Sequence, residues 1–165
     1  MKKGMTEMIT CTFAGHKEVY QSGISDALDR AIAGILSQDE DSFCFLVGGM
    51  GQFDGMCAAA VRKAKRLFPD KSITLCLVLP YFKQELNESK EYYEQMYDDV
   101  YIPMELTGVH PKGAITKRNR LMVNQSDYLI AYVCREYGGA YSTLKYAQKR
   151  NLKIENLSKP AHATM

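Results

Sequence analysis

Residues 43–79 read FCFLVGGMGQFDGMCAAAVRKAKRLFPDKSITLCLVL, and this stretch decides the fold class. An apolar run of strand length, 43–47, ends at a glycine-rich turn, and a second such run covers 73–79. Between them apolar residues recur with helical spacing over 56–68, and Pro69 marks the end of that helix. Continuous apolar runs are typical of strands that are covered on both faces. The stretch therefore predicts a parallel strand–helix–strand unit.

The same alternation continues on both sides of this unit. Further strands are expected over residues 8–13, 100–104, 128–133 and 152–157. Further helices are expected over residues 24–36, 84–96, 115–125 and 142–150. Ser22 and Asp54 stand where they can cap the first two helices. The pattern predicts an α/β fold with a Rossmann-like, doubly wound, mostly parallel sheet and helices on both faces.

Length and composition are those of one globular domain. The chain has 165 residues, of which 46% are hydrophobic and 24% are charged. We expect a single domain over residues 1–157 and a frayed tail over residues 158–165. No apolar run approaches the roughly 18 residues of a membrane span, and residues 1–10 lack the apolar core of a signal peptide. We therefore expect a cytoplasmic protein without a membrane partner.

Charge and cysteine usage limit the classes of partner. The 21 Lys and Arg against 19 Asp and Glu give a net charge of +2, which argues against nucleic acid as a partner. The five cysteines form no C-x-x-C pair and the three histidines form no H-E-x-x-H motif. We expect the cysteines to pack in the core and predict no metal site. Tyrosines within 92–101 fit a core edge or the surface of a homodimer.

Two glycine loops are the main candidates for ligand binding. In open α/β sheets, ligands bind beyond the carboxyl ends of the strands. Gly48-Gly49-x-Gly51 and Gly138-Gly139 follow two predicted strands, and each precedes a helix. Glycine permits close approach of a ligand to the backbone, and a helix N-terminus offers free N–H groups, so phosphate suits such a loop. A tight strand-to-helix turn is the structural alternative for either loop.

Side chains close to these loops complete the candidate site. His16 can bind a ligand or brace its loop, and Tyr81 can stack on a base or pack under the next helix. Arg118 suits a bidentate phosphate contact, or belongs to a solvated basic face. Ser142 and Thr143 can cap a helix or bind a phosphate oxygen. The candidate ligand-binding residues are Gly15, His16, Gly48, Gly49, Gly51, Asp54, Tyr81, Arg118, Asn119, Gly138, Gly139, Ser142 and Thr143.

Five short motifs, in chain order, resemble those of the YpsA-like branch of the SLOG superfamily. They are residues 12–17 (TFAGHK), Gly48-Gly49 with Phe53-Asp54, Leu79-Pro80-Tyr81, residues 118–122 (RNRLM) with Ser126-Asp127, and Gly138-Gly139 with Tyr146-Ala147. The resemblance spans nearly the whole chain. It implies a Rossmann-like domain that binds a nucleotide or a nucleotide-derived ligand of adenine or ADP-ribose type, as a sensor or accessory protein. We predict no cofactor other than such a bound nucleotide.

The resemblance also implies a hydrolase alternative. LOG enzymes of the same superfamily cleave the N-glycosidic bond of nucleoside 5′-monophosphates, and their arginine motif matches Arg118. Lys145, however, occupies the position of their essential glutamate, and Tyr141 replaces their third glycine. A carboxylate stabilises an oxocarbenium-like transition state, whereas a cation repels it. We therefore lean against enzymatic activity and assign no catalytic residue, with Glu136 the nearest acidic residue in the sequence.

A third hypothesis is a nucleic-acid accessory protein similar to the DprA relatives in the same superfamily. Its support is a pair of basic clusters, Lys112, Lys117, Arg118 and Arg120, and Lys145, Lys149, Arg150 and Lys153. Phosphate contacts release counterions, so a steep salt dependence of DNA binding would favour this hypothesis over a small-molecule site.

Overall fold

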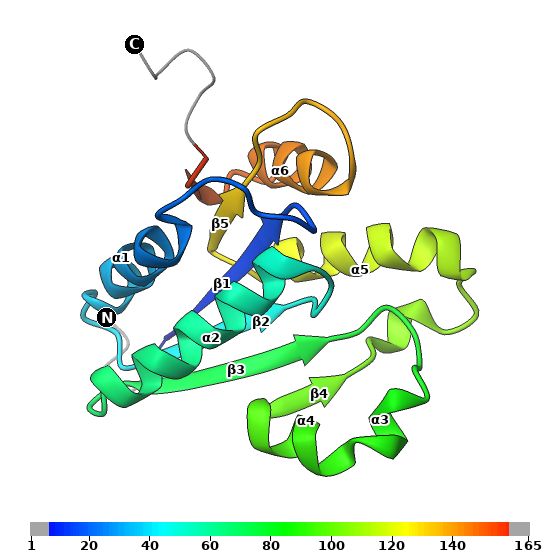
Figure 1. The fold of residues 1–165 in the computed structure, drawn as a ribbon, viewed down its shortest axis with the longest axis horizontal. Coiled ribbons are helices and arrows are strands. Elements are labelled where there is room, and N and C mark those ends of the chain that lie inside the picture. Colours follow the sequence, from blue (N-terminus) through cyan, green and yellow to red (C-terminus); the bar gives the residue numbers. More distant parts are fainter. Residues whose placement is uncertain (1–6, 159–165) are drawn as a thin grey trace.

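The computed structural model describes residues 7–158, which form a six-stranded sheet with the strand order β4-β3-β2-β1-β5-β6 (Figure 1). All neighbouring strands pair in parallel. The strands are β1 (Met8–Gly15), β2 (Ser42–Val47), β3 (Ser72–Val78), β4 (Asp99–Tyr101), β5 (Tyr128–Tyr132) and β6 (Lys153–Asn156). The expected Rossmann-like α/β class is confirmed. Of the expected tail, residues 159–165 lie outside the described residues.

Helices cover both faces of the sheet (Figure 1). On one face lie α1 (Ile24–Leu36) and α2 (Gln52–Leu67), and on the other lie α5 (Pro111–Asn124) and α6 (Gly139–Lys149). Two short helices, α3 (Glu85–Glu88) and α4 (Lys90–Met96), and the 3-10 turn η1 (Met104–Leu106) belong to the connections around β4. Because β1 is central, the chain leaves it toward β2 on one side and reaches β5 on the other. This change of direction opens a crevice at the carboxyl edge.

The larger hydrophobic core lies under α1 and α2. On α2, Phe53, Cys57 and Val61 recur at helical spacing, and none is more than 1% exposed. They pack in the same cluster as Phe45 of β2 and Leu75 of β3. Burying a side chain of this size contributes about 1.5 to 3 kcal/mol each. This packing fixes α2, and with it the glycine loop that precedes the helix.

Two expected helix caps are wrong. The residue before α1 is Gly23, and the residue before α2 is Gly51, and neither helix start has a side-chain cap. Asp54 instead lies in the first turn of α2, where its Oδ2 accepts a hydrogen bond from the backbone N–H of Met50 at 2.9 Å. Its carboxyl therefore holds the glycine loop rather than the helix end.

The helix expected over residues 84–96 is interrupted. Ser89 has φ −121° and ψ 37°, which separates α3 from α4. Neither short helix has a buried residue, so packing does not enforce one continuous helix here. On α4, the ring of Tyr93 lies edge-on to that of Tyr92 and stacks with that of Tyr97.

The cysteines do not all pack in the core. Cys11, Cys57 and Cys76 are buried as expected, but Cys44 is half-buried and Cys134 is exposed in the loop after β5. Within residues 7–158, no group of three or more His, Cys, Asp or Glu is placed to hold a metal ion. In the same range, no helix is long and apolar enough to cross a membrane.

Candidate functional site

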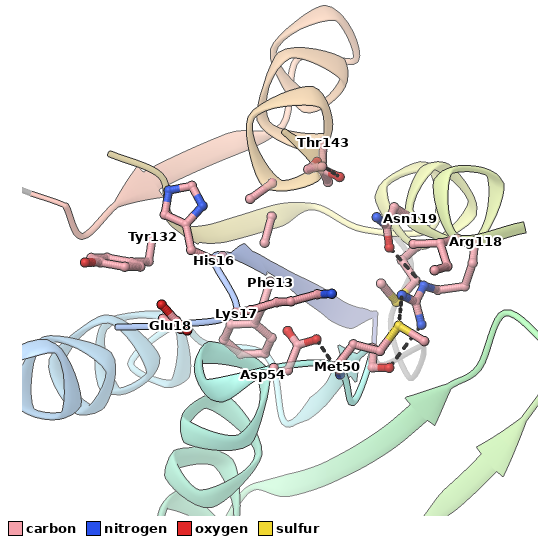
Figure 2. A pocket seen from close by; sticks show the side chains of 18 of the residues that line it. Phe13, His16, Lys17, Glu18, Met50, Asp54, Arg118, Asn119, Tyr132 and Thr143 are labelled. Carbon is pink, nitrogen blue, oxygen red and sulfur yellow. Dashed lines mark hydrogen bonds between the residues drawn. The ribbon is translucent and has the colours of Figure 1, made fainter. Parts of the chain in front are cut away.

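A cavity of about 900 Å³ lies at the carboxyl edge of the sheet, among the loops that follow β1, β2 and β5 (Figure 2). This is the place at which an open α/β sheet binds its ligands. The candidate residues that line the cavity are Gly15, His16, Gly48, Gly51, Asp54, Tyr81, Arg118, Asn119, Gly139 and Thr143. Residues from five separate segments of the chain thus meet in one space.

Gly49, Gly138 and Ser142 do not line the cavity. A Cβ atom on Gly49 would lie 2.6 Å from Cδ1 of Leu77, so this glycine allows the loop to pack on β3. Gly138 is the residue before α6, and its carbonyl oxygen accepts the backbone N–H of Ser142 at 3.0 Å. Gly49 and Gly138 thus belong to the strand-to-helix turns, which is the structural alternative that the sequence left open for the glycine loops, whereas Ser142 lies in the first turn of α6.

Arg118 lies on α5 at the inner wall of the cavity and is only 2% exposed. Its Nη1 donates to the carbonyl oxygen of Gly48 at 3.0 Å and to that of Val78 at 2.7 Å. Its Nε donates to Oδ1 of Asn119 at 2.9 Å, and its Nη2 lies 3.7 Å from Sδ of Met50 (Figure 2). The guanidinium therefore ties the ends of β2 and β3 to α5.

The carboxyl of Asp54 lies close enough to Arg118 for the two charges to act on each other, but neither cation at this end of the cavity is in a direct ion pair. None of the ion pairs found among residues 7–158 includes Arg118 or Lys17. Lys17 follows β1, and its side chain extends across the cavity above Asp54 (Figure 2). Burial raises the pKa of Asp54 to about 6, although the Met50 N–H and the charge of Arg118 act in the opposite direction. An anion that contacts Arg118 and Lys17 directly would form the ion pairs that Asp54 does not form with them.

Two helix N-termini add to the same attraction. Gly51 and Gly139 line the cavity, and they adjoin the first turns of α2 and α6. Gly51 has φ 96°, and a Cβ atom there would lie 2.7 Å from Cα of Lys17. The backbone N–H of Gln52 donates to the carbonyl oxygen of Lys17 at 2.7 Å. Glycine at position 51 thus lets the loops after β1 and β2 meet.

His16 lies in the wall formed by the loops after β1 and β5 and is 6% exposed. Its Nε2 accepts the backbone N–H of Cys134 at 3.0 Å, and the ring of Tyr132 lies edge-on with centroids 5.6 Å apart. Burial lowers the pKa of His16, and the charge of Arg135 lowers it further. The histidine therefore braces two loops as a neutral imidazole, and its contact with a ligand stays a prediction.

Several lining residues were not among the candidates, including Lys17, Glu18, Tyr20, Tyr132 and Arg135. Residues 17–20 continue the loop that contains the predicted Gly15 and His16, and Arg135 follows shortly after β5. The glycines were chosen because they follow the carboxyl ends of predicted strands. The same criterion could have identified these residues as well.

Lys145 and Glu136 are both exposed, and neither lines the cavity. The Nζ atom of Lys145 lies 6.0 Å from the centroid of the Tyr141 ring. Glu18 and Asp54, rather than Glu136, are the residues that bring carboxyl groups into the cavity.

The sequence matches no protein-family model and no curated protein, whereas the fold matches solved structures. DNA processing protein A (DprA) from Streptococcus pneumoniae superposes with a TM-score of 0.62 at 13% identity, over 89% of this chain and 49% of that one. DprA from Helicobacter pylori superposes with a TM-score of 0.60 at 18% identity, over 93% and 67% of the two chains. The chain spans about half the length of the first protein. At these identities the likeness establishes a shared Rossmann-like fold.

The expectation that nucleic acid is an unlikely partner is wrong. The H. pylori protein, which has this fold, is described by its single-stranded DNA binding mode. The expectation relied on net charge, which is a sum over the whole chain and hides a separation of charge. The sequences of α5 and α6 contain Lys and Arg but no Asp or Glu, whereas α3 and α4 contain four glutamates and one lysine.

Proposed function

We propose that the cavity binds single-stranded nucleic acid, with one backbone phosphate between Arg118, Lys17 and the N-termini of α2 and α6. The observation that carries this proposal is the buried guanidinium of Arg118, whose hydrogen-bond partners within residues 7–158 are all uncharged. Nη1 already serves two carbonyl oxygens, whereas Nη2 faces only a thioether sulfur, which is a weak acceptor. Nη2 is therefore the nitrogen that would donate to a phosphate oxygen.

The basic faces of α5 and α6 support a strand rather than an isolated phosphate. The two helices contact each other, with the guanidinium of Arg120 5.1 Å from the centroid of the Tyr146 ring. Their exposed basic residues are Lys112, Lys117, Arg120, Lys145 and Lys149. Contacts of such residues with phosphates supply affinity without sequence preference. The strand would leave the cavity over these helices.

The DprA likeness supports the same proposal through the fold, and the motif resemblance supports the proposal that the chain is a member of the SLOG superfamily, in its YpsA-like branch. Because this chain spans about half of the S. pneumoniae protein, strand binding is the one activity that we propose for it.

Binding of a free nucleotide is the second candidate. A cavity of about 900 Å³ is within the size range of small-molecule sites. The same cation pair would then hold the phosphate of an adenine or ADP-ribose derivative. The two candidates differ outside the cavity, because only a strand would reach the exposed basic residues of α5 and α6.

Fluorescence anisotropy with a labelled 20-nucleotide oligo(dT) tests the proposal. We expect binding that weakens steeply between 50 and 200 mM salt and a loss of affinity in Lys149→Ala, with Lys90→Ala on α4 as the matched control. AMP and ADP-ribose should compete only weakly. Tight binding of these nucleotides with no binding of the oligonucleotide would contradict the strand proposal and favour the second candidate.

A further inference from the structure

We infer that His16 donates a hydrogen bond from Nδ1 to an uncharged acceptor on a nucleobase, in a base subsite at the opposite end of the cavity from Arg118. The inference rests on the proposed function, because it assumes that a nucleotide unit enters the cavity. It adds the recognition of the base, which the phosphate contacts alone do not provide.

The tautomer of His16 follows from its one backbone contact. The N–H group of Cys134 can only donate, so the Nε2 atom that lies 3.0 Å away must be an unprotonated acceptor. A neutral imidazole with an unprotonated Nε2 has its proton on Nδ1. The backbone of the loop after β5 therefore fixes His16 as a donor through Nδ1.

The Nδ1 atom is accessible from the cavity. No hydrogen bond of Nδ1 is found among residues 7–158, and no buried polar side-chain atom in that range lacks a partner. Nδ1 is thus in contact with the space that His16 lines, although the side chain as a whole is 6% exposed. A buried ring with one donor open to a cavity is suited to ligand recognition.

The surroundings of His16 favour a base over a second phosphate. Figure 2 shows His16, Tyr132 and Glu18 on one side of the cavity and Arg118 on the other. The carboxylate of Glu18 would repel a phosphate but can accept from an amino or imide group of a base. The ring of Tyr20, which is 83% exposed and also lines the cavity, offers a face for stacking. Arg135 also lines this end and its charge acts on His16, so the carboxylate of Glu18 and the guanidinium of Arg135 give the subsite mixed charge. This end therefore suits a flat group that carries both donors and acceptors.

Two substitutions separate the two roles of His16. In His16→Gln, the amide oxygen can still accept from the Cys134 N–H, but no donor remains at the Nδ1 position. In His16→Asn, the amide nitrogen can replace the Nδ1 donor, but the contact with Cys134 is lost. The melting temperature of each variant shows whether the contact with Cys134 is kept. Its affinity for the probes shows whether the Nδ1 donor contributes to binding.

The probes are a labelled oligo(dT) and the same oligonucleotide with tetrahydrofuran abasic sites. We expect the wild-type protein to prefer the base-bearing probe. His16→Gln should reduce that preference about three- to tenfold and leave the abasic affinity unchanged, whereas His16→Asn should retain it. Equal losses on both probes in His16→Gln, or loss of the preference in His16→Asn alone, would overturn the inference. If the wild type binds both probes equally, the base subsite is refuted while the phosphate site stands.

Nitrogen NMR of the wild-type protein, with His labelled by ¹⁵N, gives a test that does not depend on the folding of a variant. The resonances of His16 should show a neutral ring protonated at Nδ1, and the Nδ1 signal should shift on addition of the base-bearing probe but not of the abasic probe. A ring protonated at Nε2, or an equal shift with both probes, would contradict the inference. Failure of the wild type to bind either probe would refute the proposed function as well.

Discussion

The guanidinium of Arg118 donates to the carbonyl oxygen of Gly48 at 3.0 Å, which joins a residue of α5 to the first glycine after β2. A Cβ atom on Gly48 would lie 3.0 Å from Cζ of Arg118. The arginine and the glycine therefore fit one another, and the shape of the glycine loop depends on a side chain from the other face of the sheet. The candidate phosphate site is thus a property of the tertiary fold and not of the loop alone.

Arg118→Ala should weaken oligonucleotide binding more than Arg120→Ala. Loss of a charged hydrogen bond costs roughly 1.5 to 3 kcal/mol, which corresponds to about a 10- to 150-fold loss of affinity. Arg120 is exposed beside the Tyr146 ring and serves as the matched control. Anisotropy titrations of both variants measure the effect, and small, equal losses would show that the strand makes no phosphate contact with Arg118.

Arg118→Ala should also lower stability, because the carbonyl oxygens of Gly48 and Val78 lose their donor inside the protein. An unpaired buried acceptor costs about 1 to 3 kcal/mol. Denaturant unfolding of the ligand-free variant measures this loss of stability. The same experiment shows whether the variant is folded at the assay temperature, which is the condition for interpreting its loss of affinity.

Gly139→Asp should abolish oligonucleotide binding without unfolding the protein. No atom lies within 4 Å of a Cβ built on Gly139, and an acidic residue is favourable in the first turn of a helix. The new carboxylate would repel a phosphate by an energy on the order of 4 kcal/mol at 4 Å. The measurement is the shift in melting temperature on addition of oligo(dT), with Gly139→Asn as the uncharged control. A shift retained in full by Gly139→Asp would place the phosphate elsewhere.

Asp54→Asn should stabilise the protein at neutral pH. Because the pKa of Asp54 is raised to about 6 in the folded state, ionisation above that pH opposes folding, whereas below about pH 4 the group is neutral in both states. The gain in the variant should therefore be absent near pH 3.5, grow as the pH rises through 4 to 6, and reach at most about 3 kcal/mol. Urea midpoints at pH 3.5, 5 and 7.5 measure it, and a gain that is independent of pH would contradict the raised pKa.

The wild-type protein should release no free base from AMP, GMP, CMP or UMP. Lys145 stands in place of the LOG-type glutamate in the sequence, and its side chain does not line the cavity. Chromatography of the reaction mixture measures base release. Turnover near the usual enzymatic range of about 1 to 1000 per second that disappears in Arg118→Ala would instead establish the hydrolase hypothesis.

Local sequence patterns predicted the strands and most helices because their apolar spacing is repeated over each element. The same patterns failed where no packing enforces the element, as at Ser89, where the expected helix is interrupted. They also misplaced Asp54, because a cap and a first-turn carboxyl that holds the preceding loop look alike in sequence.

The positions of the predicted strand ends led to candidate residues, most of which line the cavity. They did not predict which of these residues contact each other. The hydrogen bond from Cys134 to His16 depends on β1 and β5 being neighbours, although residues 16–127 separate them in the chain. The position of Lys17 depends likewise on its close approach to Gly51 of another loop. Such contacts follow from the order of the strands, which apolar spacing does not encode.

A crystal structure of the protein with a short oligo(dT) shows directly whether a strand binds beside Arg118. We expect a backbone phosphate in the cavity, with an oxygen within about 3 Å of Nη2 of Arg118 and near the ammonium of Lys17. The strand should continue from the cavity over α5 and α6. A strand bound on another surface, with no phosphate beside Arg118, would refute the proposed phosphate site.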